Sequence, residues 1–142
     1  MTKKVYQNTI KVYDKLGENY LRKIAKVIPV ARIGFLKNLP KGADILDVGC
    51  AGGRDAKEFV KRGFAVTGID LSGIFIKIAK KEVPKARFLK MNVLDLKFSK
   101  ESFDAIWAQA VLLHLDRKDV PKTMKSFYTI LRKGGLLDIT WI

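Results

Sequence analysis

The chain has 142 residues, of which 48% are hydrophobic, enough for one globular domain with a buried core rather than a disordered tail. No apolar run approaches the roughly 20 residues that span a bilayer, and no apolar stretch follows the first residues as in a signal peptide. Cys50 is the only cysteine, which excludes an internal disulfide and favours a reducing, cytoplasmic setting.

The sequence is strongly basic, with 28 Lys and Arg against 14 Asp and Glu and a net charge of +14. Residues 1–41 carry ten of the basic residues and two of the acids. A patch that binds nucleic acid is one interpretation of this charge. A lysine-rich solvated surface is the other, and we favour it because no aromatic residues interleave with the basic ones as they do in nucleic-acid modules.

Residues 1–41 are predicted to be helical, with Tyr13, Leu16 and Tyr20 on one apolar stripe and Pro29 as a kink or stop. From Ala43 onward, short apolar strands alternate with amphipathic helices. The expected strands are 43–48, 65–69, 87–91, 103–108 and 136–142, and the expected helices are 53–62, 72–82 and about 117–132. Ser72 is expected to cap the second of these helices, and Gly134 and Gly135 to end the third.

This alternation predicts an α/β fold, with a mostly parallel sheet of about five strands and helices on both faces. In such sheets, ligands bind beyond the carboxyl ends of the strands. The glycine-rich and polar segments of this chain follow those ends. We therefore expect the functional residues to meet at one edge of the sheet.

A glycine-rich loop follows the first strand, with the sequence Asp47-Val48-Gly49-Cys50-Ala51-Gly52-Gly53-Arg54. Small residues allow a tight turn and let a ligand approach the backbone closely. The G-x-G-x-x-G pattern of dinucleotide sites would need glycine at positions 51 and 54, so that match is poor. The carboxylate of Asp47 would repel a pyrophosphate, and it suits a ligand with a positive end.

The segment from Asp44 to Gly53 resembles the first motif of class I S-adenosylmethionine-dependent methyltransferases, with Ala51 in place of the usual middle glycine. The resemblance covers residues 1–142 and is strongest over 43–138. It implies a Rossmann-like sheet of strand order 3-2-1-4-5, with an N-terminal helical lid at 1–41 and a cofactor-binding region at 42–142 within a single structural domain. It also implies S-adenosyl-L-methionine as cofactor and S-adenosyl-L-homocysteine as product.

Asp70 ends the second strand 21 residues after Gly49, close to the spacing of about 20 expected for an acid that binds a ribose. NAD and S-adenosylmethionine both contain a ribose, so Asp70 alone does not separate these two cofactors. A carboxylate at the start of a helix is its purely structural interpretation.

The resemblance implies a role for each of several loop residues. Asp47 would face the ammonium group of the cofactor, Leu71 would pack on the adenine, and Asn92, where the family usually has an acid, would accept a hydrogen bond from the adenine amino group. The complete predicted cofactor-binding set is Asp47, Gly49, Cys50, Ala51, Gly53, Asp70, Leu71, Asn92, Val93, Ala108, Gln109, Tyr13 and Tyr20.

The catalytic residues stay unassigned. His114, the only histidine, is a candidate general base near the expected substrate mouth, and a structural histidine is the alternative. One histidine and scattered acids do not predict a metal site. Methyl transfer is a direct displacement, to which alignment and exclusion of water contribute much of the rate.

The leading hypothesis is therefore a methyltransferase that acts on a small molecule. The alternatives are a module that binds S-adenosylmethionine without turnover, a nicotinamide-dependent oxidoreductase, and a nucleic-acid binder that keeps the fold. Complete family members continue with two further strands beside the fifth. Without them, an edge carrying Leu136, Leu137, Ile139, Trp141 and Ile142 would be open, and a homodimer through this edge is one expectation.

Overall fold

The structure, a computed structural model, describes residues 3–25 and 31–140. The helices and strands follow in the order α1 (Lys3–Ala25), α2 (Ala31–Lys37), β1 (Asp44–Val48), α3 (Arg54–Lys61), β2 (Ala65–Asp70), α4 (Gly73–Glu82), β3 (Arg87–Lys90), β4 (Phe103–Gln109), the 3-10 turns η1 (Leu112–His114) and η2 (Arg117–Asp119), α5 (Val120–Ile130) and β5 (Leu131–Thr140).

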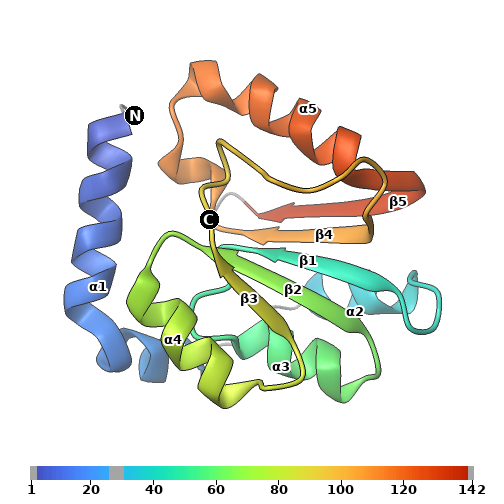
Figure 1. Cartoon of the computed structure of the whole chain (residues 1–142), viewed down its shortest axis with the longest axis horizontal. Coiled ribbons are helices and arrows are strands. Elements are labelled where there is room, and N and C mark those ends of the chain that lie inside the picture. Colours follow the sequence, from blue (N-terminus) through green and yellow to red (C-terminus); the bar gives the residue numbers. More distant parts are fainter. Residues whose placement is uncertain (1–2, 26–30, 141–142) are drawn as a thin grey trace.

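The strands form one sheet in the order β3-β2-β1-β4-β5, and every neighbouring pair is parallel (Figure 1). The predicted α/β class and strand order are thus confirmed. Helix α5 covers one face of the sheet, α3 and α4 cover the other, and α1 stands beside the carboxyl ends of the strands (Figure 1). The sheet reverses its winding at β1 and β4, so the crevice for a ligand opens at this end.

Two apolar clusters hold the layers together, one on each face of the sheet. Leu46 and Ile106 face the layer that contains Phe127 of α5, whereas Ile45 and Trp107 face the layer that contains Phe59 of α3. Neighbouring residues of one strand therefore contribute to opposite layers, as the period of two requires. Strand β1 is buried in four of its five positions, and these include Asp47 as well as three apolar residues.

A buried carboxylate joins three elements beneath the glycine loop. Asp55 of α3 accepts hydrogen bonds from Trp107 Nε1 at 3.0 Å, from Arg32 Nη1 at 2.8 Å and from Arg54 Nη2 at 3.1 Å. Since Arg32 belongs to α2 and Trp107 to β4, this cluster fixes both elements to the start of α3. A buried charge of this kind persists only when it is paired, as it is here.

Ser72 caps α4, as the sequence predicts, and also fixes α1. Its hydroxyl accepts the backbone N–H of Phe75 at 3.1 Å and donates to the carboxylate of Asp14 in α1.

Helix α1 is kinked at Gly17, which has φ 45° and ψ −129°. The predicted apolar stripe is wrong at Leu16, which lies 46% exposed because α1 meets the rest of the protein only on the side that faces α4 and the pocket.

The C-terminal helix is shorter than predicted and the last strand is longer. Helix α5 ends at Ile130, and Leu131 already has extended torsions and pairs with Phe103 of β4. Gly134 and Gly135 therefore do not end a helix. They lie inside β5, where the register with β4 shifts. A Cβ at position 135 would lie 2.8 Å from the carbonyl oxygen of Arg132, so glycine is needed for this irregularity.

Some expectations concern residues that the structure does not describe, namely Pro29, Trp141 and Ile142. Within the described residues, β5 pairs only with β4 and so forms one edge of the sheet. No helix in residues 3–25 and 31–140 has the length and apolar character to cross a membrane.

We expect Ser72→Ala to lower the free energy of unfolding by about 2 kcal/mol, because it removes a helix cap worth about 1 kcal/mol and the hydrogen bond to Asp14. Urea unfolding followed by circular dichroism measures this change. Ser126→Ala is the matched control, since its hydroxyl bonds only to a carbonyl within an exposed turn of α5, and a change below about 0.5 kcal/mol is expected. Equal effects of the two substitutions would contradict the role of Ser72.

Candidate functional site

The glycine loop between β1 and α3 is fixed to the end of β2. The backbone N–H groups of Gly49 and Cys50 both donate to the carbonyl oxygen of Ile69, at 2.8 Å and 3.0 Å. Gly49 has φ 71°, and a Cβ added there would lie 2.5 Å from Cγ2 of Val111. The loop can therefore turn between strand and helix only with glycine at this position.

Ala51 has a positive φ, in the left-handed region that favours glycine. Its φ is 47°, which costs a residue with a side chain roughly 1–2 kcal/mol. Its backbone N–H donates to Oδ2 of Asp70 at 3.0 Å, and this bond offsets part of the strain. The carboxylate of Asp70 thus holds a residue with a side chain in a conformation that favours glycine.

Asp70 connects the two loops that follow β1 and β2. Its Oδ2 accepts from Ala51 and its Oδ1 accepts the backbone N–H of Ser72 at 2.9 Å. Burial raises the pKa of Asp70, and the two backbone hydrogen bonds oppose this rise. Each carboxylate oxygen keeps a further lone pair, so Asp70 can accept two more hydrogen bonds from a ligand.

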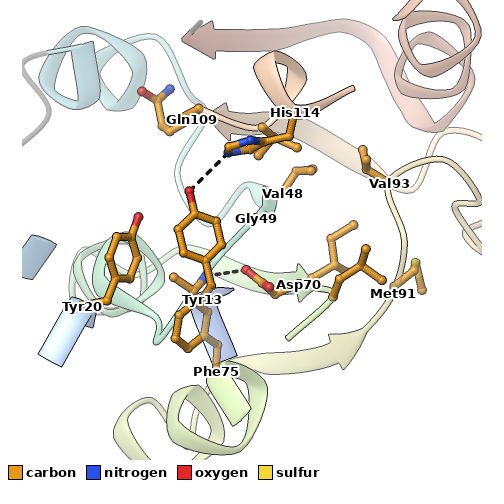
Figure 2. A pocket seen from close by; sticks show the side chains of 15 residues that line it. Tyr13, Tyr20, Val48, Gly49, Asp70, Phe75, Met91, Val93, Gln109 and His114 are labelled. Carbon is orange, nitrogen blue, oxygen red and sulfur yellow. Dashed lines mark hydrogen bonds between the residues drawn. The ribbon is translucent and has the colours of Figure 1, made fainter. Parts of the chain in front are cut away.

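A pocket opens at the carboxyl ends of the strands, between the glycine loop, Asp70 and α1 (Figure 2). Its lining consists of Tyr13, Tyr20, Val48, Gly49, Ala51, Ile69, Asp70, Leu71, Phe75, Met91, Val93, Gln109, Ala110, Val111 and His114. Met91 and Val93 lie beyond Asp70 at one end, whereas Tyr20 and Gln109 lie at the other (Figure 2). The pocket is thus long and mostly apolar, with a few polar groups along it.

Tyr13 links α1 to the far side of the pocket. Its hydroxyl lies 3.4 Å from Nε2 of His114, and Figure 2 shows it pointing toward that imidazole. The same ring contacts Tyr20 and Phe75, with centroid distances of 5.0 Å and 6.3 Å. Burial lowers the pKa of His114, so its imidazole is neutral at neutral pH.

Gln109 lies at the pocket with its side chain fixed by the last strand. Its Nε2 donates to Asp138 at 3.0 Å, and its Oε1 accepts from the hydroxyl of Thr140 at 2.5 Å. Both partners belong to β5. The orientation of this amide is therefore set by a strand that does not itself line the pocket.

The structure does not bring every predicted cofactor residue to the pocket. Ala108 and Cys50 are buried in the core, and Gly53 lies against Ala79 and Val83 of the neighbouring helix region. Asn92 uses its Oδ1 to accept the N–H of Leu94 at 2.9 Å, so its side chain closes a turn. Burial raises the pKa of the Cys50 thiol well above its usual value, which argues against a nucleophile.

Asp47 is also buried behind the pocket, at 3% exposure. Its Oδ2 is the buried side-chain polar atom without a hydrogen-bond partner among the described residues. Burial, with the neighbouring charge of Asp55, raises the pKa of Asp47 well above its usual value, and Arg54 only partly opposes this. Burial therefore favours the protonated form of a group that the sequence analysis expected to be a carboxylate.

The sequence analysis missed several lining residues, which are Val48, Ile69, Phe75, Met91, Ala110 and Val111. All of them except Phe75 lie within three residues of a predicted site residue, at or just after the end of a strand, whereas Phe75 lies in α4, four residues after Leu71. A weak signal was thus available, because the last apolar residue of a buried strand faces the same crevice as the polar residue after it. Among the described residues, no group of three or more His, Cys, Asp or Glu is arranged to hold a metal ion.

Comparison with known proteins identifies the class to which this fold and pocket belong. Residues 46–139 match the family described as "Methyltransferase domain", and the chain belongs to this family.

Three similar proteins illustrate the range of the family. The chain is 34% identical over 121 residues to the 2-methyl-6-phytyl-1,4-hydroquinone methyltransferase of a Synechocystis species, covering 82% of this chain and 37% of that protein. It is 30% identical over 106 residues to the ubiquinone biosynthesis O-methyltransferase of Coxiella burnetii, covering 72% of this chain and 44% of that protein. The chain thus spans less than half the length of these two relatives.

The crystal structure of a TehB-like SAM-dependent methyltransferase from Corynebacterium glutamicum superimposes with a TM-score of 0.72 at 25% identity. The alignment covers 99% of this chain and 78% of that chain. The fold is therefore that of a known methyltransferase.

The buried carboxyl group of Asp47 gives the stability of the protein a defined pH dependence. Above about pH 4 the unfolded chain has lost the proton of Asp47, whereas the folded chain keeps it up to its raised pKa. The folded state thus binds more protons, and this group lowers the free energy of unfolding as pH rises through that interval. We expect Asp47→Asn to remove this decline, as measured by urea unfolding from about pH 4 to 7. A pH profile parallel to that of the unchanged protein would contradict the assignment.

Proposed function

We propose that the chain is the cofactor-binding domain of an S-adenosylmethionine-dependent methyltransferase that acts on a small molecule by direct methyl transfer. The observation that carries this proposal is Asp70, a carboxylate at the pocket that joins the loops after β1 and β2 and keeps acceptor capacity for a ribose. Membership of the methyltransferase domain family supports S-adenosylmethionine, rather than NAD, as the cofactor whose ribose binds to Asp70.

The residues of the pocket fit this cofactor. Leu71, Met91 and Val93 form an apolar end beyond Asp70 for the adenine, and the backbone at Gly49 and Ala51 is open to the amino-acid part. We assign cofactor contacts to Tyr13, Tyr20, Gly49, Ala51, Asp70, Leu71, Val93 and Gln109, which line the pocket. The other predicted residues do not line the pocket and would support the lining residues by packing against them or closing the adjacent turns. They are Asp47, Cys50, Gly53, Asn92 and Ala108.

When bound, S-adenosylmethionine supplies a methyl group on a sulfonium sulfur. The chain orients that group and excludes water, and the lid formed by α1 closes the pocket through Tyr13 and Tyr20. His114 is the general base in this proposal, because it is neutral, lines the pocket and presents Nε2 to a hydroxyl. It would take the proton of the acceptor as the new bond to the methyl carbon forms.

The acceptor in this proposal is a small molecule, in keeping with the names of the two relatives, a 2-methyl-6-phytyl-1,4-hydroquinone methyltransferase and a ubiquinone biosynthesis O-methyltransferase. We further place the protein in the cytoplasm, supported by a single, buried cysteine. Self-association through the open edge of β5 and a nucleic-acid contact through the basic surface remain subordinate parts of the proposal. Light scattering tests the first, and titration with a short RNA tests the second.

Calorimetric titration with S-adenosylmethionine, S-adenosylhomocysteine and NAD tests the cofactor. We expect the first two to bind, and Asp70→Ala to weaken them by about thirtyfold, or about 2 kcal/mol, through loss of charge-assisted hydrogen bonds. The control is Asp95→Ala, which removes an exposed carboxylate that pairs with Lys97 and should leave binding unchanged. Binding of NAD alone would refute the proposed cofactor.

Turnover, measured as release of S-adenosylhomocysteine, tests His114. We expect His114→Asn to lower kcat by about 10²- to 10⁴-fold while the cofactor Kd stays the same. The activity of the unchanged protein should persist below the ordinary histidine pKa of 6.5 and fall as pH drops through the lowered pKa of His114. Full activity in His114→Asn would contradict its role as general base. Alignment of the two reactants would then account for the rate.

A further inference from the structure

The side chain of Gln109 lies between two polar residues of the last strand. Gln109 ends β4 and pairs with Thr140 of β5, while Trp107 of β4 pairs with Asp138. Paired residues of neighbouring strands, and residues two apart along one strand, point to the same face of a sheet. The side chain of Gln109 can therefore reach both Asp138 and Thr140 at the carboxyl end of β5.

The chemistry of these two partners fixes which way the Gln109 amide points. A carboxylate only accepts hydrogen bonds, so Asp138, which lies 3.0 Å from Nε2, requires the amino group of the amide on its side. The hydroxyl of Thr140 then donates to Oε1, at 2.5 Å. One N–H and one oxygen lone pair of the amide stay available to a ligand. A ligand in the pocket thus meets an amide whose orientation is already set.

Asp138 also brings a negative charge close to the end of the pocket at Gln109. Among the residues that the structure describes, Asp138 forms no salt bridge. Asp70 is the charged residue of the lining, and no Lys or Arg belongs to the described lining. Arg54, at the start of α3, is paired with Asp55. This end of the pocket therefore favours a positively charged group over a neutral one.

From these contacts we propose that Asp138 and Thr140 are positioning residues, which orient the Gln109 amide and make the pocket prefer a cationic ligand to its neutral counterpart. This inference rests on the proposed function, in which Gln109 contacts the cofactor. S-adenosylmethionine carries a positive sulfonium, whereas S-adenosylhomocysteine has a neutral thioether in its place. Asp138 thus favours the methyl donor over the product, so the product competes less with fresh cofactor.

Asp138→Asn tests the charge. Asparagine has nearly the same shape and can still accept a hydrogen bond from Nε2 of Gln109, so the charge is what is lost. We expect S-adenosylmethionine to bind about three- to tenfold more weakly, as for one charge that acts across a hydrogen-bonded amide, and S-adenosylhomocysteine to change by less than about twofold. Calorimetric titration with each ligand gives the ratio of the two dissociation constants. An unchanged ratio would overturn the inference, because a merely structural effect weakens both ligands alike.

Asp44→Asn is the matched control. It makes the same change of charge at the first residue of β1, at the end of the sheet away from the pocket, where the carboxylate pairs with Arg132. The ratio of the two dissociation constants should stay within about twofold of that of the unchanged protein. A fall as large as that in Asp138→Asn would assign the effect to the net charge of the chain and would contradict the inference.

Thr140→Val tests the orientation of the amide while the charge stays in place. Valine has nearly the same shape but cannot donate to Oε1 of Gln109, so the amide gains freedom. We expect both ligands to bind about threefold more weakly at an unchanged ratio. NMR relaxation of the Gln109 side-chain amide should show greater mobility in the free variant, and Gln7 is the only other glutamine in the sequence, which simplifies the assignment. A side chain as rigid as in the unchanged protein would refute the positioning role of Thr140.

The outcomes separate this inference from the proposed function. If both ligands bind and Asp138→Asn weakens them equally, the inference fails while the cofactor proposal stands. If neither ligand binds to the unchanged protein, the proposed function fails, and the preference for the cation fails with it. The relaxation measurement needs no ligand, so it decides the positioning of Gln109 in either case.

Discussion

The carboxylate of Asp70 is the constraint on which the rest of the site depends. Its two oxygens hold the backbone N–H groups of Ala51 and Ser72, and so set the distance between the loops after β1 and β2. Ser72 in turn caps α4 and bonds to Asp14, which places α1 over the pocket. One side chain at the end of a strand thus positions the glycine loop, the helix beside it and, through Ser72, the helix that closes the site.

The strands could be predicted from the sequence because burial on both faces favours short, largely apolar runs, whereas their order was implied by the resemblance to the methyltransferase family. The cap at Ser72 could also be predicted, since it depends on one local hydrogen bond. Gly134 and Gly135 were misinterpreted because a glycine pair marks the end of a helix and an irregularity in a strand equally well. Only the pairing with β4 decides between the two, and that pairing is not local.

The predicted site residues divide in a similar way. Asp70 and Gly49 reach the pocket because each ends or follows a strand at the winding reversal. Asp47 points away from the crevice, since alternation along β1 directs its side chain toward Asp55 and Trp107, and the sequence does not show on which face a strand begins. Phe75 was missed because its ring reaches the pocket only once α4 lies against α1.

The contact between Gln109 and β5 has a mechanical consequence. The amide at the pocket is held by Asp138 and Thr140, which belong to the outermost strand of the described sheet. A strand has two edges, and the outer edge of β5 carries backbone groups that can pair with another strand. A strand that paired with this edge would thus contact the same strand that sets the orientation of the Gln109 amide.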